Sequence, residues 1–580
     1  MRRVPIRARA TVLLKKYSVP IKISRVDRRY SRKQVQMMKM QLIVLTIVLN
    51  LHLPSTWADS FTNRLNISSG STLAPQGVEA NSHSFNTAAA ISSDERFVVF
   101  SSDATNLVAN DRNDASDIFL RDRWFNQTTR ISVDNAGIEG NAASTQPVLS
   151  ANGRFIAFSS KATNFVAGEA NGVADIFVYD TQTKQVRGIN PLDSNGDSVN
   201  PSITADGRWV VFESLASNLI ADDTNSASDI FAFDTQSNQL TRLSINDAGV
   251  AGDGHSFNPI IAANGNFVVF ASEASNLVAG DTNVTSDIFL HNLTTHTTQR
   301  ISQTAMQADR GSYHPSIDAE GKVIVFESDA TSLVENDSNA VSDIFIKDLT
   351  TGQLQRITSP TGEQANSAAY YPTISATGRY VAFTTAATNL VSGNANALFD
   401  ILKYDRQTQQ LARVNVSVNG EQGNFQSLKL PMSLSWNGDY AVFTSNATNV
   451  VYGDNNLSFD VFVYQAVTPV RAAFSFKTNV LTLPLVKLSD GRTFNAQFLM
   501  NAQGLFVLQT AEELHLDTPE TSGFFSLMNG MLYLSMVSVA HPSSFDPATE
   551  ETDGYEATLL YVPNTDPLQF QLLHAEILNL

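Results

Sequence analysis

The chain has 580 residues and no cysteine, its formal net charge is −17, and only 16% of its residues are charged. This length allows two or more domains with a large buried core. The lack of cysteine excludes disulfides, thiolate metal sites, a cysteine nucleophile and a bacterial lipoprotein anchor. Abundant Asn, Ser and Thr with few charges are typical of a turn-rich β protein.

The N-terminal residues predict export. Residues 1–36 form a basic extension with twelve Lys/Arg and one acid, which we interpret as a start codon assigned too early; a nucleic-acid- or membrane-binding arm is the alternative. Residues 37–58 have the features of a secretory signal peptide, with an apolar stretch at Gln41–Leu53 and small residues before Asp59. That stretch is too short for a transmembrane helix, and no later segment is long enough.

The charge of the remaining chain limits its partners. Residues 1–58 carry 13 Lys/Arg and one Asp, so the rest has 26 basic and 55 acidic residues and a net charge of −29. Nucleic acid and anionic membranes repel such a chain. We therefore expect a secreted or periplasmic monomer with no nucleic-acid partner and no transmembrane segment after signal cleavage.

A motif of the form Asp-x-Asn-x-x-x-Asp, followed by an apolar strand, returns seven times. Its last positions are 54 to 60 residues apart. A period of this length made of strand-like pieces predicts a repeat architecture. The seven copies are Asp111/Asn113/Asp117, Glu169/Asn171/Asp175, Asp223/Asn225/Asp229, Asp281/Asn283/Asp287, Asp337/Asn339/Asp343, Asn394/Asn396/Asp400 and Asp454/Asn456/Asp460.

Each period holds four short strands. In the second copy we expect them at 146–150, 155–160, 175–180 and 185–190. Four antiparallel strands per period predict propeller blades, and so an all-β, seven-bladed β-propeller over residues 59–468. Asn63–Ser68 matches the fourth strand of other copies but precedes any first strand. We expect it to complete the last blade, which removes open sheet edges.

Several pieces resemble a known family. Ala376–Phe383, Ser342–Asp348 and Gln355–Thr358 are similar to TolB-type, WD-repeat-like β-propeller repeats. The loop between the second and third strands is longer here than in that family. The resemblance implies a periplasmic or secreted interaction scaffold, but no single activity, because propellers include both binding proteins and enzymes.

The acidic loops are candidate calcium sites. The spacing of positions 1, 3 and 7 resembles the start of oxygen-donor calcium loops, so all 21 motif residues are candidate ligands. Position 3 is always Asn and position 7 always Asp, whereas position 1 is Asp except for Glu169 and Asn394. Asn and Asp also build Asx-turns without a metal. Calcium binding and turn chemistry therefore both stay open.

The central channel is the other candidate site. First strands are innermost in a propeller, so the residues just before them should surround the channel mouth. Here they form either a ligand-binding cluster or a polar rim bonded to the backbone, and we assign no catalytic residue. These rim residues are Asn86, Gln146, Asn200, Asn258, His314, Tyr371 and Leu430, with His83 and His255 close by in the sequence.

Residues 469–580 lie beyond the repeats and predict a small β-sandwich-like domain. For the whole protein we expect a non-enzymatic scaffold that binds protein or glycan partners of the cell envelope, with calcium in the repeated loops. The alternative is a polysaccharide lyase or glycoside hydrolase with an active site on the propeller axis.

Overall fold

The computed structural model describes residues 61–68, 78–87 and 90–465, with short gaps at 222, 305–306, 395, 418–420, 452–453 and 455, and the strands between 472 and 578. The basic extension 1–36 and the signal peptide 37–58 lie outside the described residues, so both stay predictions. Within the described part of the chain, no helix is long and apolar enough to span a membrane.

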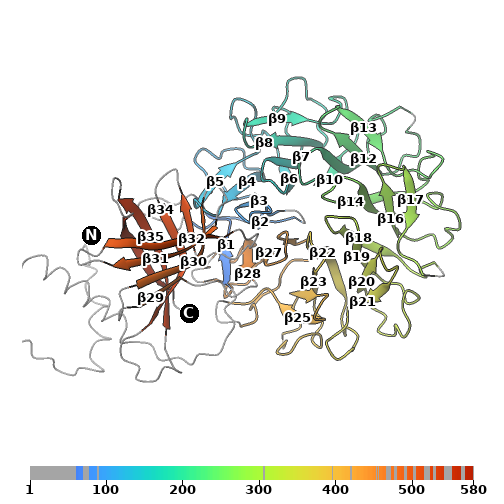
Figure 1. Ribbon diagram of the computed structural model, residues 1–580. Coiled ribbons are helices and arrows are strands. Elements are labelled where there is room, and N and C mark those ends of the chain that lie inside the picture. The colour runs from blue at the N-terminus through green and yellow to red at the C-terminus, as the bar shows by residue number, and fades with distance from the viewer. Residues whose placement is uncertain are drawn as a thin grey trace, which may run out of the picture. The chain divides into compact units, whose positions relative to one another are not determined.

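Seven four-stranded antiparallel sheets follow one another along the chain. Figure 1 shows them arranged around a common centre, with the first strand of each sheet innermost. This is the predicted seven-bladed propeller. We number the blades in chain order.

Blades 1 to 3 have the following strands. Blade 1 contains β2 (Ser84–Phe85), β3 (Phe97–Ser102), β4 (Asp117–Asp122) and β5 (Gln127–Arg130). Blade 2 contains β6 (Ser144–Leu149), β7 (Phe155–Ser160), β8 (Asp175–Asp180) and β9 (Gln185–Gly188). Blade 3 contains β10 (Ser198–Ile203), β11 (Trp209–Ser214), β12 (Asp229–Asp234) and β13 (Gln239–Arg242).

Blades 4 to 7 continue the pattern. Blade 4 contains β14 (Ser256–Ile261), β15 (Phe267–Ser272), β16 (Asp287–Asn292) and β17 (Thr297–Arg300). Blade 5 contains β18 (Ser312–Ile317), β19 (Val323–Ser328), β20 (Asp343–Asp348) and β21 (Leu354–Arg356). Blade 6 contains β22 (Ala369–Ile374), β23 (Tyr380–Thr385), β24 (Asp400–Asp405) and β25 (Gln410–Arg413). Blade 7 contains β26 (Ser433–Leu434), β27 (Tyr440–Ser445), β28 (Asp460–Gln465) and β1 (Phe61–Arg64).

The middle strands of each blade are buried on both faces, because neighbouring blades pack on either side. In blade 3, Phe212 of β11 and Phe231 of β12 are fully buried and stack with ring centroids 5.8 Å apart. Blades 1, 2, 4, 5 and 7 have the same stacked Phe pair at 5.6–6.0 Å. Burial on both faces explains why these strands are nearly continuous apolar runs.

The N-terminal strand closes the ring, as predicted. β1 pairs antiparallel with β28 from Phe61 opposite Gln465 to Arg64 opposite Phe462, so it lies slightly before the expected range. The fully buried Asn66 follows this strand. Its Nδ2 donates to Asp460 Oδ1 at 2.5 Å, and its Oδ1 accepts a hydrogen bond from the Val461 amide at 3.1 Å. One side chain thus joins the two ends of the propeller.

The strands after residue 471 form a separate eight-stranded sheet. In spatial order they are β29 (Ala472–Ser475), β30 (Val480–Leu488), β31 (Thr493–Met500), β32 (Leu505–Leu514), β36 (Gln569–Leu578), β35 (Thr552–Val562), β34 (Met531–Ala540) and β33 (Gly523–Ser526). Parallel pairings of β29 with β34 and of β30 with β33 join the two ends of the sheet. The C-terminal β domain is therefore confirmed, whereas packing into two layers stays a prediction.

We expect Asn66→Ala to lower the free energy of unfolding by about 2 kcal/mol, because it leaves the buried Asp460 Oδ1 and the Val461 amide each without this partner. Urea unfolding of the variant and the wild type measures the difference. Asn63→Ala, on an exposed position of the same strand, is the control and should change stability by less than about 0.5 kcal/mol. Equal stability of Asn66→Ala and the wild type would rule out this contact as a closure device.

Candidate functional site

The last Asp of every acidic loop is the first residue of a third strand, and none of the seven is more than 2% exposed. In blade 3, Asp229 Oδ1 accepts a hydrogen bond from Ser244 Oγ at 2.5 Å, and its Oδ2 accepts one from Asn225 Nδ2 at 3.0 Å. A carboxylate this deeply buried needs such partners. The aspartate therefore connects the acidic loop to the segment that follows the fourth strand.

The central Asn of the motif forms an Asx-turn in every copy. Asn225 Oδ1, for example, accepts a hydrogen bond from the Ala227 amide at 3.0 Å. The side-chain oxygen that was predicted to ligate calcium thus accepts a hydrogen bond within the turn. Calcium ligation by the same oxygen stays a prediction. The same bond, from the amide two positions later, occurs in the other six loops at Asn113, Asn171, Asn283, Asn339, Asn396 and Asn456.

The side-chain nitrogen of the central Asn is engaged as well. In blade 3, Asn225 Nδ2 donates to the Gly252 carbonyl at 2.9 Å, in addition to Asp229. Corresponding bonds to a backbone carbonyl, at 2.8–3.1 Å, are donated by Asn113, Asn283, Asn339, Asn396 and Asn456. An amide nitrogen is a hydrogen-bond donor and does not coordinate a cation. The Nδ2 atoms of these asparagines thus stabilise the loop, and calcium ligation by their Oδ1 atoms stays a prediction.

In six blades an arginine from the fourth strand reaches the acidic loop. Arg242 Nη1 lies 3.2 Å from Asp223 Oδ1 and 3.3 Å from Asp229 Oδ2. Arg130, Arg300 and Arg356 bridge the first and last carboxylates of their loops in the same way. Arg64 does so in blade 7, and Arg413 contacts Asp400 in blade 6, where position 1 is Asn394. A guanidinium therefore lies between the groups that were predicted to hold a metal.

Burial dominates the electrostatics of these loops. It raises the pKa of Asp111, Asp343 and Asp454 to about 6, although the neighbouring arginine acts in the opposite direction. The acidic triad Glu79, Asp454 and Asp460 illustrates the balance, because all three carboxylates contact Arg64. Arg64 is thus the shared counter-ion of three carboxylates, and metal binding at this triad stays a prediction.

Blade 2 has no arginine at the fourth-strand position that contacts the acidic loop in the other blades. Phe177 of β8 pairs with Gly188 of β9, at the position where Phe231 pairs with Arg242 in blade 3. Glu169 and Asp175 are 9% and 2% exposed, and neither forms an ion pair among the described residues. Burial, together with the neighbouring Glu169, raises the pKa of Asp175 to about 6, although hydrogen bonds from Asn171 and Ser194 act in the opposite direction.

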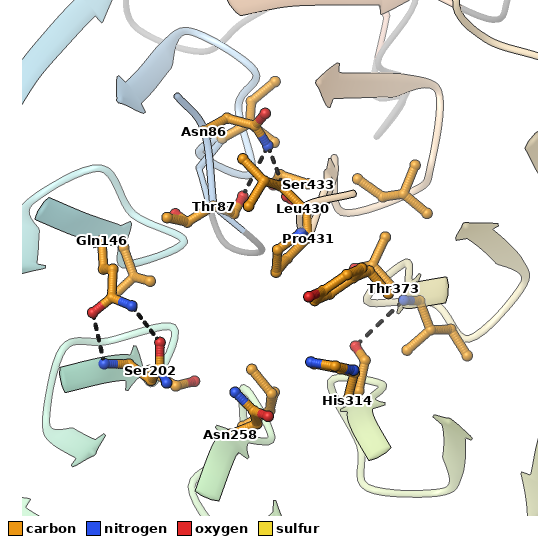
Figure 2. Close-up of a pocket in the computed structure, with 18 of the residues that line it drawn as sticks. Asn86, Thr87, Gln146, Ser202, Asn258, His314, Thr373, Leu430, Pro431 and Ser433 are labelled. Carbon is orange, nitrogen blue, oxygen red and sulfur yellow. Dashed lines mark hydrogen bonds between the residues drawn. The ribbon is translucent and has the colours of Figure 1, made fainter. Parts of the chain in front are cut away.

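The seven predicted rim residues all line one cavity of about 800 Å³ on the propeller axis, here called the axial pocket. Figure 2 shows Asn86, Gln146, Asn258 and His314 facing this common space from different blades. The structure therefore brings together residues that are more than 200 positions apart in the chain. The walls below the rim are mostly proline and aliphatic side chains from the first strands.

A backbone kink positions five of the rim side chains. Gln146, Asn200, Asn258, His314 and Tyr371 each precede a proline and have φ between 47° and 55°. The first strands of blades 2 to 6 change register at this point, as in a β-bulge. Positive φ is strained for such residues, and bulges redirect side chains. The repeated strain indicates a geometry that the fold maintains at this rim.

Rim backbone amides bond to side chains of the preceding blade. Asn258 N donates to Glu213 Oε2 at 2.8 Å, and Tyr371 N donates to Glu327 Oε2 at 2.6 Å. Glu327 Oε1 also lies 2.9 Å from His314 Nδ1. Burial raises the pKa of Glu213. These carboxylates position the rim backbone of the next blade.

The rim also has an aromatic and cationic side. The His314 and Tyr371 ring centroids are 4.1 Å apart. Lys429 Nζ lies 3.8 Å from the centroid of the Tyr370 ring and 4.5 Å from that of Phe399. Among the lining residues that the structure describes, none is Asp or Glu. The pocket thus combines amide, imidazole and phenol groups with one ammonium.

The two other histidines near the rim accept hydrogen bonds from backbone amides. His83 Nδ1 accepts a hydrogen bond from the Phe459 amide at 3.0 Å, and His255 Nδ1 accepts one from the Ser228 amide at 2.9 Å. Neither lines the axial pocket. Sequence reasoning missed a further set, the fourth-strand arginines, although arginine recurs at that position in six of the seven copies.

No family model matches this chain, and no curated protein does. Solved propellers are similar to it. TolB from Acinetobacter baumannii is 15% identical with a TM-score of 0.32, covering 64% of this chain and 80% of that one. An oligogalacturonate lyase from Vibrio parahaemolyticus is 12% identical with a TM-score of 0.42, covering 71% and 98%.

The β-propeller domain of the Trilobed protease from Pyrococcus furiosus is 13% identical with a TM-score of 0.41, covering 66% of this chain and 93% of that domain. A TolB protein is thus among the structures similar to this chain, as its repeats predict. At these TM-scores the likenesses carry no argument about activity, and the propeller rests on its own strand pairing.

We expect Arg242→Ala to lower the free energy of unfolding by about 3 kcal/mol, because it leaves two buried carboxylates in blade 3 without their counter-charge. Denaturant unfolding measures this loss. Arg208→Ala is the matched control: Arg208 pairs with Asp234 but is 43% exposed, so its loss should lower the free energy of unfolding much less than the loss of Arg242. Similar losses for both variants would contradict a structural role for the buried arginine.

Proposed function

We propose that the protein is an exported propeller that binds a glycan of the cell envelope in the axial pocket without changing it chemically. The observation that carries this proposal is the kinked rim, where five successive blades direct amide, imidazole and phenol side chains toward one cavity. Strain at the same position in five blades is typical of a preserved binding geometry rather than of a loop end.

The chemistry of the pocket favours a glycan. Amide side chains both donate and accept hydrogen bonds, which suits sugar hydroxyl groups. Tyr371 adds a flat apolar surface beside His314. A protein partner, the other possibility that the sequence leaves open, needs a larger contact area than a concave pocket of about 800 Å³ provides.

The carboxylates near the axial pocket help to distinguish the two enzyme alternatives, a hydrolase and a lyase. Glycoside hydrolysis usually uses two carboxyl groups at the reacting bond, and none of the described lining residues is acidic. A lyase is a second candidate, because His314 has a carboxylate partner in Glu327 and lies beside Tyr371. Together, His314 and Tyr371 offer a base and an acid for proton transfer. The test below therefore includes a search for products.

We expect the full-length protein to bind one class of envelope oligosaccharide in a glycan array, with isothermal titration giving its affinity. Asn258→Gly should weaken binding about tenfold, because one hydrogen-bonding group is lost; glycine tolerates the positive φ at this position. Gln182→Ala, exposed on the turn after β8, should leave the affinity unchanged.

Failure to bind any glycan, or equal affinity of Asn258→Gly and the wild type, would contradict the proposal. Mass spectrometry of the ligand after incubation separates binding from catalysis. Shortened or unsaturated products that disappear in His314→Gln would favour the lyase, whereas an intact ligand supports a binding protein.

A further inference from the structure

The acidic loop of blade 2 lacks the arginine that contacts the carboxylates of the other six loops. We propose that Glu169 and Asp175 bind a single calcium ion, and that blade 2 alone uses a metal where the other blades use an arginine. This site is independent of the axial pocket and of its proposed ligand.

The fourth strand of blade 2 provides no counter-charge. Gly188 occupies the arginine position, yet it has no positive φ that would require glycine. A Cβ at this residue would lie 3.6 Å from the Phe177 ring, which is ordinary contact. Neither backbone nor packing therefore explains the glycine, and its effect is that no guanidinium reaches the carboxylates from the fourth strand.

Hydrogen bonding leaves one oxygen of each carboxylate without a partner. Glu169 Oε1 and Asp175 Oδ1 are both buried, and neither has a hydrogen-bond partner among the described residues. In blades 6 and 7, the equivalents Asn415 and Asn66 donate their Nδ2 to Asp Oδ1. A buried carboxylate oxygen without a partner is costly, and a bound cation removes that cost.

The connection after β9 explains why Asp175 lacks this partner. Asn190 Oδ1 accepts a hydrogen bond from the Ile176 amide at 2.9 Å, as its counterparts do in other blades. Its Nδ2, however, donates to Ser198 Oγ at 2.7 Å instead of to the aspartate. Asn171 Nδ2 donates to Asp175 Oδ2 at 2.7 Å, so it orients this carboxylate rather than binding a metal.

The donor set selects the kind of cation. Both candidate ligands are carboxylates, which suit hard cations. Calcium accepts irregular oxygen sets completed by carbonyls and water, whereas magnesium requires a near-octahedral geometry. Glu169 replaces the usual Asp, so its carboxylate is carried on a side chain one methylene longer. Two carboxylates predict weak affinity, about 0.1–1 mM, typical of extracellular modules.

The test uses the full-length chain, treated with EDTA and dialysed. Equilibrium dialysis with calcium should give one equivalent per chain, and 10 mM calcium should raise the unfolding midpoint by about 3 °C. Equimolar magnesium should raise it by less. Glu169→Gln should abolish both effects. Gly188→Arg should also abolish them and should raise the midpoint in EDTA, because it supplies the guanidinium that the other blades contain.

Asp223→Asn in blade 3 is the control, and its calcium response should equal that of the wild type. No bound calcium in the wild type would overturn the proposal, and so would several equivalents per chain. Binding that persists in Gly188→Arg would also overturn it, even if Glu169→Gln failed to fold. A midpoint that rises only on acidification would show that a shared proton, and not calcium, neutralises the pair.

Discussion

A buried carboxylate at the start of each third strand organises the propeller. Asp229 shows its connections: it accepts hydrogen bonds from Asn225 in the loop and Ser244 after the fourth strand, and it contacts Arg242 on that strand. Because a buried charge needs all of these partners at once, the loop, the strand and the exit from the blade adopt one geometry. Repetition of this requirement produces seven nearly equivalent blades.

The same requirement limits what the acidic loops can do. A pair of carboxylates in a dry loop needs a positive partner, and either a guanidinium or a metal ion can provide it. An arginine contacts the loop carboxylates in six blades. Among the described residues, blade 2 has glycine at this position and no arginine beside its pair. In our proposal, metal binding therefore depends on one residue outside the motif.

Closure of the propeller ring forms the axial pocket. Neighbouring rim residues belong to neighbouring blades, and the backbone amides of Asn258 and Tyr371 donate to carboxylates of the blade before. These two rim residues are therefore positioned by a different blade from the one that carries them. A pocket built this way exists only when all blades are in place, so binding at the axis should be lost together with the fold.

The sequence by itself determined the repeat, the strand order and the closure by the N-terminal strand, because periodicity and turn residues are local signals. It also located the rim, since the first strand of a blade is always innermost. It could not determine what neutralises the acidic loops. Arg242 lies 13 residues after Asp229 on another strand, and the motif looks the same whether an arginine or a metal lies between its carboxylates. Only the strand register shows that the recurring arginines lie beside these carboxylates and that Gly188 takes their place in blade 2.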